Sequence, residues 1–120
     1  MKRYDILIVD DEQRYATMLA NRLTLRGLTC QVRYDGRTAI DIVETDFFAW
    51  VILDLRLPDC YGVEVLTQIK AISPETKVII LTGHGTEQDR KQCLALGAHA
   101  FVNKPLDIGR MIAIMGQDKA

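Results

Sequence analysis

The sequence lacks a surplus of charge of either sign. It carries 15 Lys and Arg residues against 16 Asp and Glu residues, which gives a net charge of -1 at pH 7. Domains that bind nucleic acids or anionic membranes usually show a basic excess. We therefore expect no direct binding of nucleic acid and no membrane association by this domain.

Paired cysteines and long apolar runs are also missing. Cys30, Cys60 and Cys93 are far apart and form no C-x-x-C motif, which argues against a zinc site or a disulfide framework. Asp10 and Asp11 stop the first apolar run, so it does not have the form of a signal peptide, and no run is long enough to span a membrane. These absences predict a reducing, cytoplasmic setting.

Internal repeats, low-complexity tracts and linkers are absent as well. Hydrophobic residues make up 48% of the 120 residues and charged residues 26%, the usual balance of a globular protein with one core. We expect a single domain that spans residues 1–120.

Apolar runs typical of strands alternate with segments of helical period. The runs at 48–53 and 78–81 are apolar on both faces, as in parallel strands covered by helices on each side, whereas 29–34 alternates like an edge strand. The sequence predicts a doubly wound α/β fold, with a five-stranded parallel sheet in the order 2-1-3-4-5 and five helices. The expected strands are 6–9, 29–34, 48–53, 78–81 and 100–103, and the helices begin near 12, 36, 62, 87 and 107.

Polar side chains follow four of these strands at their carboxyl ends. Asp10 and Asp11 follow the first strand, Asp54 the third, Thr82 the fourth and Lys104 the fifth. In the proposed order the carboxyl ends of these strands are neighbours, and ligands bind at this edge of a doubly wound sheet. The five side chains are therefore expected to converge on one crevice.

Each residue type suits phosphoryl transfer. Clustered carboxylates repel one another and favour a hard cation such as Mg²⁺. Asp54 is the best candidate nucleophile, because it is central and is the only acid at its strand end. Lys104 supplies a positive charge and Thr82 a hydroxyl donor for the phosphoryl oxygens.

Simpler interpretations exist for each residue alone. Asp11 can be the N-cap of the first helix, and a strand-end aspartate, threonine or lysine is often only a solvated loop residue. Their combination at four strand ends favours a site, because the simpler explanations would all have to coincide where this fold binds its ligands.

Four segments carry a resemblance to a known family. They are VDDE (9–12), VILDLRLPDCYG (51–62), VIILTGHG (78–85) and GAHAFVNKP (97–105). Together they are similar to the receiver (CheY-like) domains of bacterial two-component response regulators, and the resemblance covers essentially the whole chain. It implies a signalling domain rather than an enzyme, one that catalyses only its own phosphotransfer and autodephosphorylation.

The resemblance also implies roles for individual residues. Asp54 resembles the phosphoacceptor. The implied Mg²⁺ ligands are Asp54, Asp11, the backbone carbonyl of Arg56 and, mostly through water, Asp10. The implied phosphoryl donor is a sensor histidine kinase or a histidine phosphotransfer protein.

The implied switch residues are Thr82 and Phe101, with Lys104 as the partner of the phosphoryl group. The family expectation for the Lys104–Pro105 bond is cis, although the sequence alone allows either isomer. Two departures from the family pattern are modest. Phe101 stands where tyrosine is commoner, so its ring has no hydroxyl, and Leu106 often corresponds to phenylalanine.

The expected output is a change in the face formed by the fourth helix, the last strand and the last helix, which would bind an output partner or a second copy. Residues 86–92 are all non-apolar, so this helix is either mobile or merely exposed. Other residues keep two interpretations. Ile114 belongs to the docking face or to a broad core stripe, and Arg56 and His84 shield the phosphoryl group or are ordinary exposed side chains. Cys60 is expected to be a free thiol rather than a redox sensor.

Three other functions are weaker. A phosphohydrolase that uses an aspartyl-phosphate needs a second acid two residues after the nucleophile, where Arg56 stands. A flavin- or nucleotide-binding module needs a glycine- or hydroxyl-rich loop after the first strand, and residues 9–12 would repel phosphate. An unphosphorylated interaction domain is disfavoured because every element of the acceptor site is present.

Overall fold

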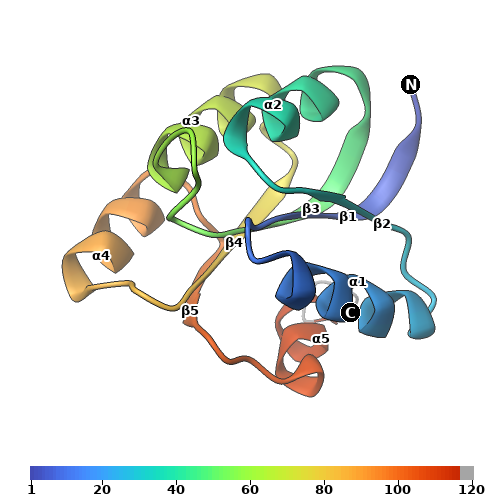
Figure 1. Ribbon diagram of the computed structural model, residues 1–120. Helices are drawn as coiled ribbons and strands as arrows, with labels where there is room; N and C mark the ends of the chain where they lie inside the picture. Colours follow the sequence, from blue (N-terminus) through green and yellow to red (C-terminus); the bar gives the residue numbers. More distant parts are fainter. Residues whose placement is uncertain (117–120) are drawn as a thin grey trace.

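The computed structural model describes residues 1–116, so positions 117–120 of the expected domain lie outside the described residues. Within the described part, five strands and five helices alternate strictly along the chain, as predicted (Figure 1). The strands are β1 (Arg3–Val9), β2 (Cys30–Arg33), β3 (Phe47–Leu53), β4 (Lys77–Thr82) and β5 (Ala100–Asn103). The helices are α1 (Gln13–Leu25), α2 (Gly36–Thr45), α3 (Gly62–Ile72), α4 (Glu87–Ala95) and α5 (Ile108–Gly116).

The strands form one parallel sheet in the order β2-β1-β3-β4-β5, which confirms the predicted topology. The three central strands are those with the most continuous apolar runs, because both of their faces are covered. The edge strand β2 is half-buried at all four positions. Its Cys30 and Val32 pack against the core, as the alternating pattern predicts.

Helices cover both faces of the sheet (Figure 1). Helices α1 and α5 lie on one face, and α2, α3 and α4 lie on the other. The central strands therefore contribute to two cores. In β1, Leu7 and Val9 join the α2–α3 core, whereas Ile6 and Ile8 join the α1–α5 core. The period-two geometry of a strand requires this division.

Local sequence sets the helix ends. Gly27 and Gly97, each the second residue after α1 or α4, adopt φ values of +87° and +106°, a conformation that glycine takes at little steric cost. Thr86 and Asp89 form a reciprocal capping box at the start of α4. Asp107 accepts a hydrogen bond from the Arg110 N–H, so it caps α5 as predicted.

Helix α4 has few anchors in the core. Cys93 is its one buried residue, as expected from the polar stretch at 86–92. In α5, Ile114 is half-buried against the core, which favours the broad core stripe over an exposed docking residue. None of the helices within residues 1–116 has the length and apolarity needed to cross a lipid bilayer.

Candidate functional site

The backbone places four of the predicted residues at one edge of the sheet. Val9 and Leu53 are register partners, and the Asp54 N–H donates to the Val9 carbonyl at 3.0 Å. On the other side, the Lys104 N–H donates to the Thr82 carbonyl at 2.9 Å. Because the carboxyl ends of parallel strands lie at the same edge of the sheet, the residues at these ends of β1, β3, β4 and β5 lie beside one another.

The Lys104 ammonium joins three carboxylates. Its Nζ lies 2.8 Å from Asp10 Oδ2, 3.0 Å from Asp54 Oδ2 and 2.8 Å from Glu12 Oε1. One oxygen from each of the three acids lies within 4.8 Å of the others. The side chains of Asp10 and Asp54 are 5% and 7% exposed, whereas that of Glu12 is 64% exposed. The cluster is thus a buried pair of acids with a third acid at its mouth.

Burial and ion pairing act in opposite directions at this cluster. Burial raises the pKa of Asp10 above its usual range, although the hydrogen bond from Lys104 partly offsets this effect. Burial alone lowers the pKa of Lys104, but its hydrogen bonds to Asp10, Glu12 and Asp54 outweigh burial and raise that pKa well above its ordinary value. The lysine is therefore a permanent cation at neutral pH.

Backbone amides and one aromatic ring hold the cluster in place. The Glu12 N–H donates to Asp10 Oδ1 at 2.9 Å, and the Arg56 N–H donates to Asp54 Oδ1 at 3.3 Å. The Lys104 ammonium lies 4.7 Å from the centre of the Tyr15 ring, a cation–π contact. Neither Glu12 nor Tyr15 was predicted as a residue of this site. The third acid of VDDE was the available signal for Glu12, and Tyr15 lies one helical turn after it.

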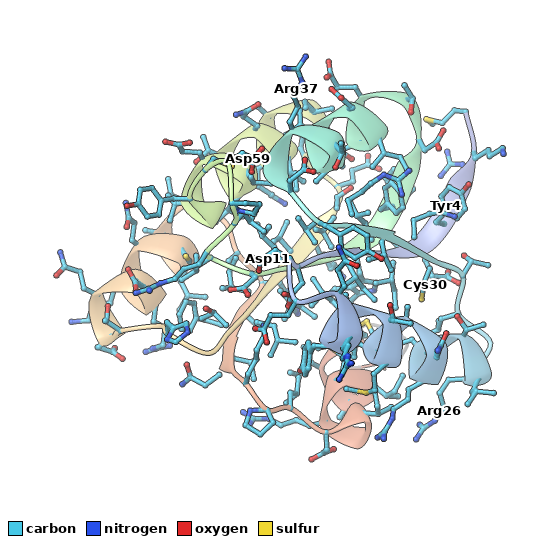
Figure 2. The ribbon with its side chains drawn as sticks, viewed as in Figure 1. Tyr4, Asp11, Arg26, Cys30, Arg37 and Asp59 are labelled. Carbon is cyan, nitrogen blue, oxygen red and sulfur yellow. The ribbon has the colours of Figure 1, made fainter. Side chains whose placement is uncertain are left out.

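Asp11 does not join this cluster. It lies in the loop between β1 and α1 (Figure 2), its side chain is exposed, and the third carboxylate of the cluster comes from Glu12 instead. The alternative that Asp11 caps α1 is wrong, because Glu12 occupies the N-cap position and no side-chain hydrogen bond caps this helix. A role for Asp11 as a metal ligand stays a prediction.

The two predicted switch residues lie on either side of a glycine. Thr82 is fully buried, and its Oγ1 accepts a long hydrogen bond of 3.4 Å from the His84 N–H. A Cβ atom at Gly85 would lie 2.7 Å from Cε1 of Phe101 and 2.9 Å from the Thr82 methyl group. Phe101, which is half-buried, therefore packs against the loop that follows Thr82. The Lys104–Pro105 bond is cis, as the resemblance implied.

Arg56 and His84 are exposed, and they line a hollow of about 360 Å³ between the β3–α3 loop and α4. Tyr61, which is 73% exposed, lies on the same wall. The side chains of Arg56 and His84 both reach solvent beside the loop that follows Asp54. Shielding of a phosphoryl group therefore stays a prediction for each of them.

Cys60 has the properties of an inert thiol. Burial, together with the negative charge of the neighbouring Asp59, raises the pKa of Cys60 to about 11. At neutral pH the thiol is therefore protonated, and thiolate is the reactive form. This favours the predicted free thiol over a redox sensor.

Asp59 connects the β3–α3 loop to another helix (Figure 2). Its Oδ1 and Oδ2 accept hydrogen bonds from the Gly36 and Arg37 N–H groups at 2.9 and 3.0 Å, at the start of α2. These hydrogen bonds, that from Gly36 foremost, lower the pKa of Asp59 below its ordinary value near 3.8. A carboxylate at a helix N-terminus is also favoured by the helix dipole.

Asp59→Asn is expected to lower the free energy of unfolding at pH 7 by on the order of 0.5 kcal/mol, a small value because the carboxylate is exposed. A lowered pKa in the folded state stabilises the fold above the unfolded pKa, and this contribution is lost as pH falls. The difference between variant and parent should therefore shrink below about pH 4. Urea denaturation from pH 7 to pH 3 measures this difference, with Asp41→Asn on the exposed side of α2 as the control. A difference that grows on acidification contradicts the stabilising role of the Asp59 carboxylate.

The donor atoms of the cluster fit a divalent cation. Three carboxylates with a single ammonium among them leave net negative charge in a partly buried site, and their oxygens are the hard ligands that Mg²⁺ and Ca²⁺ prefer. Lys104 already bridges all three acids, which shows that the cluster takes positive charge as its partner. The residues present are therefore suited to hold a metal ion.

Comparison with known proteins agrees with this geometry. The response regulator receiver domain family matches residues 6–115. The chain belongs to this family. A receiver domain is a phosphoacceptor of two-component phosphorelays, with a signalling role rather than that of a conventional enzyme, and its general partner is a histidine kinase. The hydrolase and flavin-binding alternatives are thereby set aside.

Two curated relatives of this receiver domain are regulators. The uncharacterized transcriptional regulatory protein YkoG of Bacillus subtilis is 32% identical over 113 residues, which cover 94% of this chain and 50% of YkoG. The response regulator ArlR of Staphylococcus aureus is 34% identical over 108 residues, which cover 90% of this chain and 49% of ArlR. The chain thus spans about half the length of the curated relatives it matches.

Solved receiver domains share the fold. A CheY-like receiver domain protein from Methanospirillum hungatei superposes with a TM-score of 0.91 at 26% identity, over 98% of this chain and 93% of its own. The BeF3-activated receiver domain of DrrB gives a TM-score of 0.86 at 26% identity, over 98% of this chain and 97% of its own. These matches confirm the predicted CheY-like architecture.

Proposed function

We propose that this receiver domain takes a phosphoryl group onto Asp54 from the phosphohistidine of a sensor histidine kinase or a histidine phosphotransfer protein. One observation supports this choice above all others. Asp54 is a nearly buried carboxylate at the end of a central strand, next to a second acid and in contact with a permanent cation, Lys104. Asp10 is similarly buried and also contacts Lys104, but Asp54 follows the middle strand of the sheet and is the only acid at its strand end.

In the proposed transfer, a carboxylate oxygen of Asp54 attacks the phosphorus atom. The phosphorus–nitrogen bond breaks, and the imidazole leaves with the bonding electrons. Lys104 and the Thr82 hydroxyl donate to the phosphoryl oxygens as charge gathers on them. Bound Mg²⁺ supplies positive charge that offsets repulsion between the carboxylates and the incoming group. Its proposed ligands are Asp10, Asp11, Asp54 and the backbone carbonyl of Arg56.

The proposed output is a two-state change. The phosphoryl group draws the Thr82 hydroxyl inward, and Phe101 fills the space that Thr82 vacates. The packing of both residues around Gly85 supports this, because movement of one requires adjustment of the other. The first turns of α4 follow the same loop and have few core contacts, which makes α4 the proposed moving part.

Phe101→Ala is expected to leave phosphorylation intact and to reduce the response of α4 severalfold, because it removes the ring proposed to couple Thr82 to α4. The response is the change in the amide NMR signals of α4 when beryllofluoride, a phosphoryl analogue, is added with Mg²⁺. Phe47→Ala removes another half-buried ring at the amino end of β3 and serves as the control. An undiminished α4 response in Phe101→Ala refutes this mechanism.

The remaining parts of the proposal concern the whole protein. The face formed by α4, β5 and α5 would contact an output partner or a second copy of the domain. Because the curated relatives are about twice as long, their regulatory output is only a proposal for this protein. The receiver domain is proposed to fill residues 1–120, and the cytoplasmic setting stays a prediction.

Acetyl phosphate with Mg²⁺ tests the proposed function directly. Intact mass spectrometry should show a single phosphoryl adduct that is lost slowly, and EDTA should prevent its formation because the carboxylate cluster then lacks its divalent cation. An absence of adduct with Mg²⁺ present contradicts the proposal. Rapid multiple turnover of diverse phosphoesters would instead indicate a hydrolase.

A further inference from the structure

The Lys104 ammonium already has as many anionic partners as it has protons. A lysine ammonium has three N–H donors, and Lys104 contacts three carboxylates at 2.8 to 3.0 Å. In the proposed transfer it must also donate to a phosphoryl oxygen. One of the existing contacts has to be given up when the phosphoryl group arrives.

Burial indicates which contact is the weakest. Asp10 is buried and is further fixed by the Glu12 N–H, which donates to its Oδ1. Asp54 is buried as well and carries the reaction itself. The side chain of Glu12 is 64% exposed, so its ion pair with Lys104 is the one most weakened by water and salt.

We propose that Glu12 is a positioning residue that competes with the phosphoryl group for Lys104. While Asp54 is unmodified, the Glu12 carboxylate holds the third proton of the ammonium at the mouth of the site. A phosphoryl dianion displaces it, and the exposed side chain turns into solvent. Glu12 thereby weakens phosphoryl binding at rest, an effect that rests on the proposed function of Asp54.

The test measures affinity for beryllofluoride at saturating Mg²⁺ by fluorine NMR, and the rate of phosphorylation by acetyl phosphate. Glu12→Gln is expected to raise both by roughly twofold to fivefold, the range for loss of one exposed ion pair. Raising the ionic strength should bring the ratio of variant to parent closer to one, because salt weakens the Glu12–Lys104 ion pair in the parent protein. A gain in affinity is a result that damage to the fold does not produce.

Two further variants distinguish loss of the Glu12–Lys104 contact from a general change in net charge. Glu44→Gln makes the same change on the exposed surface of α2 and should match the parent protein. Glu12→Asp keeps the charge but is one methylene too short for the contact, so it should also raise the affinity. Parental affinity in both Glu12 variants, or an equal gain in Glu44→Gln, overturns this inference alone. A parent protein that binds no beryllofluoride and accepts no phosphoryl group overturns the proposed function, and this inference with it.

Discussion

Replacing Asp54 with asparagine is expected to abolish phosphoryl uptake, with a fall in rate of at least about a thousandfold, the order seen when the nucleophile of a covalent step is removed. Asparagine has nearly the same shape, and its oxygen can still accept a hydrogen bond from Lys104. It lacks the negative charge that makes a carboxylate oxygen able to attack phosphorus. The measurement is the intact mass after incubation with acetyl phosphate and Mg²⁺.

The matched control for this prediction is Asp41→Asn. Asp41 is an exposed aspartate of α2 that lies outside the carboxylate cluster, and its substitution changes the net charge by the same amount. The control should be phosphorylated at the parental rate. A phosphoryl adduct that persists in Asp54→Asn would place the acceptor on a different residue.

Gly62→Ala is expected to lower the free energy of unfolding by about 1–3 kcal/mol, the usual cost of an extra carbon in a well-packed place. Gly62 is the first residue of α3, and its N–H donates to the Leu55 carbonyl at 2.7 Å. A Cβ atom there would lie 2.5 Å from the Asp54 carbonyl oxygen and 2.7 Å from the Leu55 Cα. Both are backbone atoms, so no side-chain rotation relieves the contact.

The same substitution should also slow phosphorylation, because the backbone that must move is that of the proposed acceptor residue. Urea denaturation gives the stability, and the rate of adduct formation gives the function. Gly116→Ala is the control, since a Cβ at that position meets no atom within 4 Å. If Gly62→Ala is as stable as the parent protein, the close approach of α3 to the Asp54 backbone is wrong.

The fold was predictable because the relevant signals are local. Apolar runs identify the strands, helical periodicity identifies the helices, and the continuous runs of β3 and β4 indicate strands covered on both faces. The helix boundaries at Gly27, Gly97 and Asp107 follow from residue chemistry as well. The sheet order follows because edge and central strands differ in composition.

Part of the site was predictable for the same reason. Asp10, Asp54 and Lys104 follow directly on strands and Thr82 ends one, and parallel strands bring their carboxyl ends to one edge. Once the order of the strands is known, these four residues have little freedom to lie elsewhere. The direct contacts of Lys104 with Asp10 and Asp54 agree with this prediction.

The loop and first-turn residues were not predictable in this way. The sequence suggested Asp11 beside Asp10, but Glu12 joins the cluster instead. The link from Asp59 to the start of α2 and the position of the Tyr15 ring were equally hidden. In each case the outcome depends on the path of a loop and on the direction of a side chain.

The sequence by itself thus determined the elements, their order and the sheet edge where the chemistry gathers, because periodicity and strand-end position are properties of the chain. Only the tertiary structure decided which acid holds Lys104 at the mouth of the site and how closely α3 approaches Asp54. Contacts of this kind join residues far apart in sequence, such as Glu12 and Lys104. Packing of the whole domain sets the distances in these contacts, and a local sequence pattern does not contain that information.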